Sequence, residues 1–224
     1  MATNVRNIIV GAAQLYLSSK LSTDGTPAAS YPLGTGTTGV AAAGASAYLD
    51  TQTSTTNGWR NVGFTSAGLE LSYEPNFGEV TVDQSLDAAR LFKQSQKVTV
   101  KTEFAEATLD NLFIVMNQQA STLTGTGLGT GGTGNYAQNL DIVGGSLGDY
   151  PVERSLIAVG QSPRSNNTVN GQERVYYAAR VMSIDTSAHA LKRDAGTFFP
   201  VNFRLLPDSS TTNNAYGRIV DRTW

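Results

Sequence analysis

The sequence predicts a mainly β protein, with a β-sandwich-like or barrel-like fold and one flanking α-helix. Apolar and polar residues alternate with a period of two in three segments between positions 68 and 104, which is typical of strands with one packed face. Only the segment 108–117 has the apolar spacing of an amphipathic helix. Stretches rich in Gly, Thr and Ser separate the patterned segments and indicate connections. We expect residues 1–224 to form a single domain.

The N-terminal part of the chain begins with an expected strand over residues 5–19, whose apolar residues are β-prone. Residues 21–57 follow as a long excursion rich in Gly, Thr, Ser and Ala, in which "DGTPAASYPLGTGTTG" offers almost nothing to bury. A second excursion of this kind spans residues 119–150. Because such segments have no core of their own, we expect both to be ordered by contact with another chain.

The most regular part of the chain runs from Gly68 to Phe104. A first strand is expected before a turn at Asn76 and Gly78, a second follows this turn, and a third covers "KVTVKTEF". The segment 84–96 is too long for a tight hairpin and is expected to be a loop. One face of these strands should pack on a core; its residues are Leu69, Leu71, Tyr73, Val80, Val82, Val98, Val100 and Phe104.

The other face of the same strands is polar and acidic. Its charged residues are Glu70, Glu74, Glu79, Asp83 and Glu103, together with Lys97 and Lys101. Five acidic and two basic side chains give this face a charge of −3, and the net charge of the whole chain is −2. The face is either an ordinary solvated sheet surface or a surface that must keep polyanions from sticking.

The expected helix carries one apolar stripe, formed by Leu109, Leu112, Phe113 and Met116. Thr108 is placed to cap its N-terminus, and the helix should pack on the apolar side of the sheet. Further strands are expected in "ERSLIAVG", "ERVYYAARVMSID", "GTFFPVNFRLL" and "YGRIVDRTW". Pro200 indicates a strand edge or a bulge in the third of these.

Catalytic and cofactor chemistry is scarce in the sequence. There is no cysteine, and the single histidine, His189, cannot form the usual zinc sites alone. Two matches to G-x-G-x-x-G, at 34–39 and 127–132, lack the strand before and the helix after that a dinucleotide site needs. No nucleophile elbow accompanies His189. We therefore expect no cofactor, no metal and no enzymatic activity.

The composition also limits the partners. A net charge of −2 and a pI near 5.4 argue against a protein that grips nucleic acid through its phosphates. Charged residues make up only 15% of the chain, which suits a surface covered by partner chains, although Ser, Thr and Asn also keep a surface wet. No apolar run reaches the roughly 20 residues that span a bilayer, so no membrane anchor is expected.

Several segments taken together resemble a known family. These are "GWRNVGFTSAGLELSYEPNFGEVTVDQSLD", then "KVTVKTEFAEATLDNL", then "RVYYAARVMSIDTSAHALKRDAGTFFPVNFRLLPD". In order and spacing they resemble the major tail tube proteins of long-tailed, non-contractile bacteriophages, over about two thirds of the chain. The excursions at 21–57 and 119–150 lie outside the resemblance.

This resemblance implies a structural virion protein of the phage tail, assembled in the host cytoplasm. Six copies would form a ring, each lending strands to a continuous inner β-barrel, and stacked rings would conduct double-stranded DNA. The lumen would be lined by Glu70, Glu74, Glu79, Asp83, Lys97, Lys101 and Glu103. We expect the segment 84–96 to dock on the adjacent ring through Leu86, Leu91 and Phe92. Expected partners are other copies, the tape measure protein, and the tail terminator and distal tail proteins.

Two alternatives stay open at this point. One is another component of the same fold, either a tail terminator or the tube protein of a phage-derived particle. The other is a carbohydrate-binding β-sandwich that uses Trp59, Tyr73 and Tyr176 as stacking platforms.

Overall fold

The computed structural model describes residues 11–22, 26–33, 44–51, 58–84, 86–118, 123–125, 138–144, 146–163, 172–185, 188–191, 193–194, 196–208 and 215–223. The elements are β1 (Gln14–Ser18), α1 (Ala45–Asp50), β2 (Trp59–Asn61), β3 (Glu70–Val80), β4 (Arg90–Phe104), α2 (Leu109–Val115), β5 (Leu123–Gly125), β6 (Gln138–Leu140), β7 (Arg154–Gln161), β8 (Gln172–Ser183), β9 (Phe199–Leu206) and β10 (Gly217–Thr223). Eight strands form one antiparallel sheet in the order β2-β1-β7-β8-β9-β4-β3, with β10 also paired to β8, and β5 pairs with β6 separately. The mainly β prediction is confirmed, but the sheet is not closed into a barrel.

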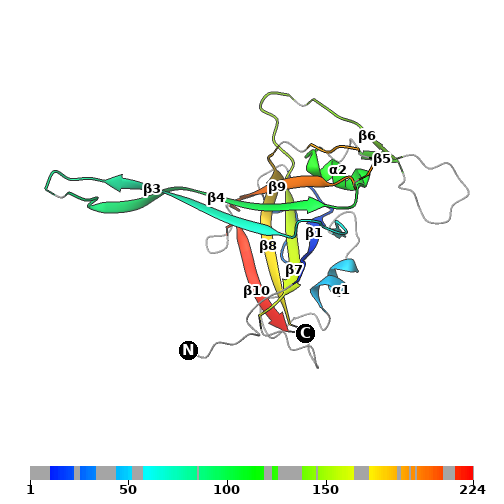
Figure 1. The fold of residues 1–224 in the computed structure, drawn as a ribbon, viewed down its shortest axis with the longest axis horizontal. Helices are drawn as coiled ribbons and strands as arrows, with labels where there is room; N and C mark the ends of the chain where they lie inside the picture. Colours follow the sequence, from blue (N-terminus) through cyan, green and yellow to red (C-terminus); the bar gives the residue numbers. More distant parts are fainter. Residues whose placement is uncertain are drawn as a thin grey trace, which may run out of the picture.

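The sheet divides into two halves along β8. One edge of β8 pairs with β10 from Gln172 to Ala178, and the same edge pairs with β9 from Arg180 to Ser183. The first half therefore contains β2, β1, β7, β8 and β10, and the second half contains the end of β8 with β9, β4 and β3. The strands of the second half run across those of the first (Figure 1). This arrangement lets the two halves pack against each other as in an orthogonal sandwich.

Gly217 makes the division of β8 possible. It has a φ of +139°, and a Cβ at this position would lie 1.9 Å from the carbonyl oxygen of Tyr177. Glycine alone fits such a close backbone approach, so the start of β10 can meet β8 where β9 takes over its edge.

The strands β1 and β7, at the centre of the first half, are buried on both faces. One core cluster fills the angle between the halves and includes Leu15, Leu156, Phe104 and Phe203, with α2 adding Phe113 and Ile114. A second cluster covers the opposite face and includes Tyr16, Ile157, Val175 and Leu49. Burial on both faces explains why β7, with the sequence RSLIAVGQ, has a continuous apolar run in place of an alternation.

The expectation that residues 24–39 offer almost nothing to bury is wrong for those that the structure describes, and the later part of the excursion 21–57 is also buried in places. Leu33, Ala45 and Leu49 are each no more than 1% exposed and belong to the second core cluster. The helix α1 had no clear signal in the sequence, and the carboxylate of Glu173 accepts the Ala45 N–H at its start at 2.8 Å. Long-range contacts order this segment within the same chain.

Several other sequence expectations are met in the described residues. The helix α2 forms, and Thr108 Oγ1 accepts the N–H of Asn111 at 3.2 Å as its N-cap. Its expected apolar stripe is only partly right, because Phe113 is buried together with Ile114 and Val115, while Leu109, Leu112 and Met116 are half-buried. The four C-terminal strands are present, and the first strand is observed at Gln14–Ser18. Residues 5–10 of that expected strand lie outside the described residues, as does much of the excursion 119–150, in which β5 and β6 are found.

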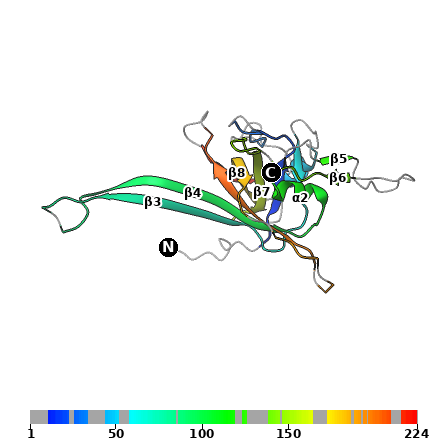
Figure 2. The ribbon, with the colours of Figure 1, turned by 90° about the horizontal axis from the view of Figure 1, so that it is seen from above.

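The expected turn at Asn76 and Gly78 and the expected loop at 84–96 are both wrong. The strand β3 continues from Glu70 to Val80, and it pairs with β4 from Arg90 onward, so residues 81–89 alone connect the two strands. The register shifts by one residue between Asn76 and Phe77, where β4 contributes an extra residue as a β-bulge. The result is one long hairpin that projects away from the body of the protein (Figures 1 and 2).

The projection of the hairpin changes the burial of its apolar residues. Val100 and Phe104, near the body, are buried as expected. Leu71, Tyr73, Val80 and Val82 were expected to pack on a core, but all four are exposed. Leu71 lies at the base of the hairpin on the outermost strand, opposite Val100, whereas the hairpin has left the body by the time it reaches the other three.

Candidate functional site

The β3–β4 hairpin holds all ten residues that the sequence singled out. Glu70, Glu74 and Glu79 lie on β3; Asp83 and Leu86 lie in the connection; Leu91, Phe92, Lys97, Lys101 and Glu103 lie on β4. Lys97 and Glu103 are half-buried, and the other eight are exposed. The hairpin is therefore the candidate site, and its two faces differ in chemistry.

The polar face of the hairpin carries opposite charges in direct register. Glu70 is paired with Lys101 across the strands, and Glu74 is paired with Lys97. Side chains that face each other across an antiparallel pair lie close enough for opposite charges to attract. Each lysine of this face therefore has a glutamate as its cross-strand neighbour.

Strand β9 extends the polar face beyond the hairpin. Arg204 pairs with Thr99, which lies between the two lysines on β4, and Arg204 is exposed. Glu103 shares the face and accepts a hydrogen bond from the Ser66 hydroxyl. Arg204 escaped the sequence analysis because it lies far along the chain and only strand pairing brings it to this surface. The polar face thus consists of Glu70, Ser72, Glu74, Lys97, Thr99, Lys101, Glu103 and Arg204.

The predicted charge of −3 for this face does not hold. Because β3 continues without a turn, its alternation places Glu79 on the opposite face from Glu70 and Glu74, where it pairs with Leu91. Asp83 lies beyond the end of β3, in the connection. The remaining Glu70, Glu74 and Glu103 are matched in number by Lys97, Lys101 and Arg204, so the polar face formed by the eight residues above is neutral overall.

The opposite, apolar face of the hairpin carries Leu71, Tyr73 and Phe77 of β3, with Leu91, Val98 and Val100 of β4. Lys93 covers part of this face: its Nζ donates to the Tyr73 hydroxyl at 2.5 Å and lies 5.0 Å from the centre of the Tyr73 ring. Phe77 and Leu91 are 55% and 60% exposed. They form an apolar knob in the distal half of the hairpin.

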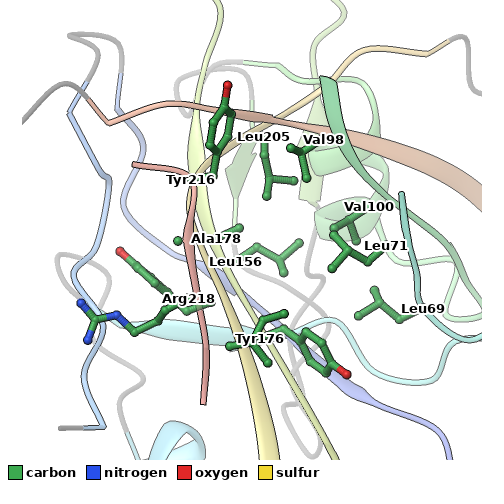
Figure 3. Close-up of a pocket in the computed structure, with 13 residues that line it drawn as sticks. Leu69, Leu71, Val98, Val100, Leu156, Tyr176, Ala178, Leu205, Tyr216 and Arg218 are labelled. Atoms are coloured by element: carbon green, nitrogen blue, oxygen red, sulfur yellow. The ribbon is translucent and has the colours of Figure 1, made fainter. Parts of the chain in front are cut away.

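An apolar cleft of about 350 Å³ opens between the two halves of the sheet at the base of the hairpin (Figure 3). Its walls are formed by Leu69, Leu71, Val98, Val100, Leu156, Tyr176, Tyr177, Ala178, Leu205, Tyr216, Gly217, Arg218 and Ile219. In Figure 3 the guanidinium of Arg218 points away from the leucine side chains, so the interior of the cleft is almost wholly apolar. Sequence periodicity gave no sign of this cleft, because its lining comes from six strands.

Charged groups inside the body serve the fold. The guanidinium of Arg154 donates from Nη1 to the Ser18 carbonyl at 3.2 Å and stacks on the Phe113 ring, 4.8 Å from its centre. Burial lowers the pKa of Arg154 to about 9. Its neighbour Arg60 donates to the Asn111 side chain, which in turn donates to the carbonyls of Val62 and Glu106. This network joins α2 to β2.

Chemistry of other kinds finds little support in the described part of the chain. Within it, no group of three or more His, Cys, Asp or Glu side chains is placed to hold a metal ion. His189 is exposed and packs edge-on against the Phe199 ring. Trp59 is only 3% exposed, so it cannot serve as a sugar-stacking platform, which removes one of the three platforms of the carbohydrate-binding alternative. None of the described helices is long and apolar enough to cross a membrane.

The fold defines a mainly β protein, and many of its exposed large apolar side chains lie on a projecting hairpin. The family described as phage tail tube protein matches residues 1–216, so the chain belongs to that family and is a component of the phage tail. No curated protein matches the chain. The match confirms the resemblance found in the sequence, and tail tube proteins are structural proteins that assemble with themselves, not enzymes.

Proposed function

We propose that the chain assembles into stacked rings of six copies, and that the stack forms the tail tube through which double-stranded DNA passes. The observation that supports this most strongly is the projecting hairpin, whose strands have 11 and 15 residues. An isolated two-stranded hairpin with exposed apolar residues is marginally stable in water, so it needs a partner. In a tube built from one kind of subunit, this partner is another copy.

The open sheet supports the same proposal. Among the described residues β3 pairs with β4 alone, so one full edge of an 11-residue strand is free. A long free edge invites pairing with other chains, and closure of several copies into a common barrel removes such edges. We propose that β3, β4 and β9 of each copy contribute to this inner barrel.

The polar face of the hairpin is proposed to line the channel. We assign Glu70, Glu74, Lys97, Lys101 and Glu103 to the lumen, with Arg204 added; Glu79 is left out because it lies on the opposite face, and Asp83 because it lies in the connection. Much of the affinity of proteins for DNA comes from Lys and Arg side chains, which neutralise phosphates and so release the counterions bound to the DNA into solution. Each lysine of this face has a glutamate beside it, so the channel wall would be hydrated but would not bind the phosphates of the DNA that passes through it.

The end of the hairpin is proposed to dock on the adjacent ring through Leu86, Leu91 and Phe92. Leu86 lies in the connection and is fully exposed, and Phe92 is 46% exposed. Apolar side chains that are exposed in the free subunit and buried in the assembly commonly carry most of the binding energy. Proposed further partners are the tape measure protein and the tail terminator and distal tail proteins, and co-sedimentation with assembled tubes tests each of them.

Electron microscopy of the concentrated protein tests the proposal directly. Hollow tubes are expected, and end-on views should have sixfold symmetry. The double variant Leu91→Asp with Phe92→Asp should remain a folded monomer by circular dichroism and form no tubes. Leu191→Asp, at a residue that is 88% exposed outside the hairpin, is the matched control and should assemble normally. Tubes of normal length from the double variant would contradict the docking role.

A further inference from the structure

The apolar cleft is flanked by two strands with unpaired outer edges. Among the described residues β3 pairs only with β4, and β10 pairs only with β8. The cleft lies between them, lined by Leu69 and Leu71 at the β3 side and by Gly217 and Ile219 at the β10 side. Free edges offer backbone N–H and C=O groups to an added extended segment. The cleft therefore offers apolar side chains, and the strands beside it offer unpaired backbone groups, to the same added segment.

The protein cannot fill this cleft with its own hairpin. The base of the hairpin, through Leu71, Val98 and Val100, forms one wall of the cleft (Figure 3). From there the hairpin projects away from the first half of the sheet (Figure 1). An occupant that resembles the hairpin must therefore come from another molecule.

The exposed apolar area of the hairpin is large enough for a stable interface. Of the 17 large apolar side chains that are exposed in the described structure, eight lie between Leu71 and Phe92. These side chains lie on both faces of the hairpin and in its connection. An aromatic side chain alone can bury about 150–250 Å², so a partner that contacts both faces would bury on the order of the 800 Å² that each partner contributes to a standard interface. The hairpin and the cleft are thus a projecting and a concave apolar surface on one chain.

We propose that the cleft of one copy takes the apolar knob, Phe77 and Leu91, from the hairpin of a second copy. The two residues lie on the same face in neighbouring cross-strand pairs, Phe77 with Lys93 and Leu91 with Glu79. A cavity of about 150 Å³ accommodates a benzene ring. The cleft, at about 350 Å³, has room for one phenyl ring and one leucine side chain. Tyr73 is less suited because Lys93 already covers its ring.

This pairing rests on the proposed function and extends it. Each copy provides one knob and one cleft, so the contact joins different surfaces of the two molecules. Such a heterologous contact repeats from copy to copy, as a tube requires, while an isologous contact would stop at a dimer.

Cysteine cross-linking tests the pairing, because the chain contains no cysteine. The variant with Phe77→Cys and Ile219→Cys is assembled, oxidised and separated on a non-reducing gel. Ile219 pairs with Tyr176 at the mouth of the cleft and is 58% exposed, so the substitution should not disturb folding. A ladder of multimers is expected. Either single-cysteine variant, and the pair Phe77→Cys with Leu191→Cys, should give no ladder.

A second variant measures the energetic role of the cleft. Ile219→Asp places a charge at the mouth of the cleft and should raise the protein concentration needed for assembly about tenfold. Its urea midpoint should equal that of the wild type, and Leu191→Asp should change neither quantity. If the double-cysteine variant forms tubes without a ladder, or if Ile219→Asp assembles at the wild-type concentration, the cleft is not the receptor, while the proposed tube survives. Failure of the wild type to form tubes overturns both proposals.

Discussion

The ring of Phe92 lies over Gly78 on the facing strand of the hairpin. The two residues are cross-strand partners, and a Cβ at position 78 would lie only 2.6 Å from Phe92 Cζ. Glycine at this position therefore makes room for the ring, which stays half exposed on the hairpin surface. The sequence suggested a turn at this glycine, but its role is to let an aromatic side chain of the neighbouring strand lie flat.

Gly78→Val should displace the Phe92 ring and weaken tube assembly about as much as Phe92→Ala does. The free energy of unfolding should change by less than about 1 kcal/mol, because both residues lie outside the core. Sedimentation of tubes over a range of protein concentrations measures the first effect, and urea unfolding measures the second. The double variant should assemble no worse than either single variant, since both remove the same contact. Assembly of Gly78→Val at the wild-type concentration would disprove this role.

The buried ion pair between Glu173 and Arg222 should be important for stability. Both side chains are about 5% exposed and lie 2.9 Å apart, and Glu173 also accepts the Ala45 N–H at the start of α1. Glu173→Gln keeps an acceptor for this N–H but leaves the Arg222 charge buried and uncompensated, which typically costs about 3–5 kcal/mol. The melting temperature should fall by on the order of 10 °C.

Combination of Glu173→Gln with Arg222→Met provides the control for this prediction. Removal of both charges eliminates the buried, unpaired cation, so part of the lost stability should return. Calorimetry of the wild type and the two variants makes the comparison. A single variant that melts with the wild type would mean that water or another group compensates Arg222.

The pair formed by Asp221 and Arg174 should make stability depend on pH. Arg174 donates two hydrogen bonds to the carboxylate, at 2.5 and 2.7 Å, and these hold the pKa of Asp221 below its usual value. A carboxyl whose pKa is lower in the folded state stabilises the fold above its unfolded pKa, about 3.9, and loses that contribution as the pH falls through the folded pKa. Because Asp221 is half exposed, the contribution is about 1 kcal/mol or less.

Asp221→Asn isolates this contribution. The wild type should exceed the variant in free energy of unfolding at pH 6, and the difference should shrink as the pH falls below about 4. Urea titrations at stepped pH measure it. A difference that stays constant down to the lowest pH at which both proteins fold would show that the charge of Asp221 is not its source.

Local patterns predicted much of this fold, and long-range contacts account for what they missed. Alternation located β3 and β4, and the capped apolar stripe located α2, because both signals depend on neighbouring residues. The docking of Leu33 and Leu49 could not be predicted, since these residues stand isolated among Gly, Thr and Ala and become buried only against the first half of the sheet.

The candidate site shows the same limit. The sequence predicted three strands and a loop for its residues, whereas the structure has one hairpin, and the face of Glu79 depended on whether Asn76 and Gly78 turn the chain. The missing turn transfers Glu79 to the opposite face, because side chains alternate along the uninterrupted strand β3. The position of Arg204 and the lining of the cleft depend on which strands become neighbours, and no local pattern contains that information.

The neutral polar face leads to a prediction about genome ejection. Glu70→Gln with Glu74→Gln removes the acidic neighbours of Lys101 and Lys97 but keeps the size of the side chains. The hairpin should lose only about 0.2–1 kcal/mol for each charge pair, so tubes should still form. The unmatched lysines can then bind phosphates, and each such contact makes the affinity for DNA fall more steeply with salt. Particles built with this variant should eject DNA more slowly than the wild type at low salt and at the wild-type rate at high salt.

The matched control, Asp141→Asn with Asp194→Asn, makes the same change in net charge at two exposed residues away from the polar face and should leave ejection unchanged. If the two variants eject DNA at the same rate at low salt, the polar face does not line the channel.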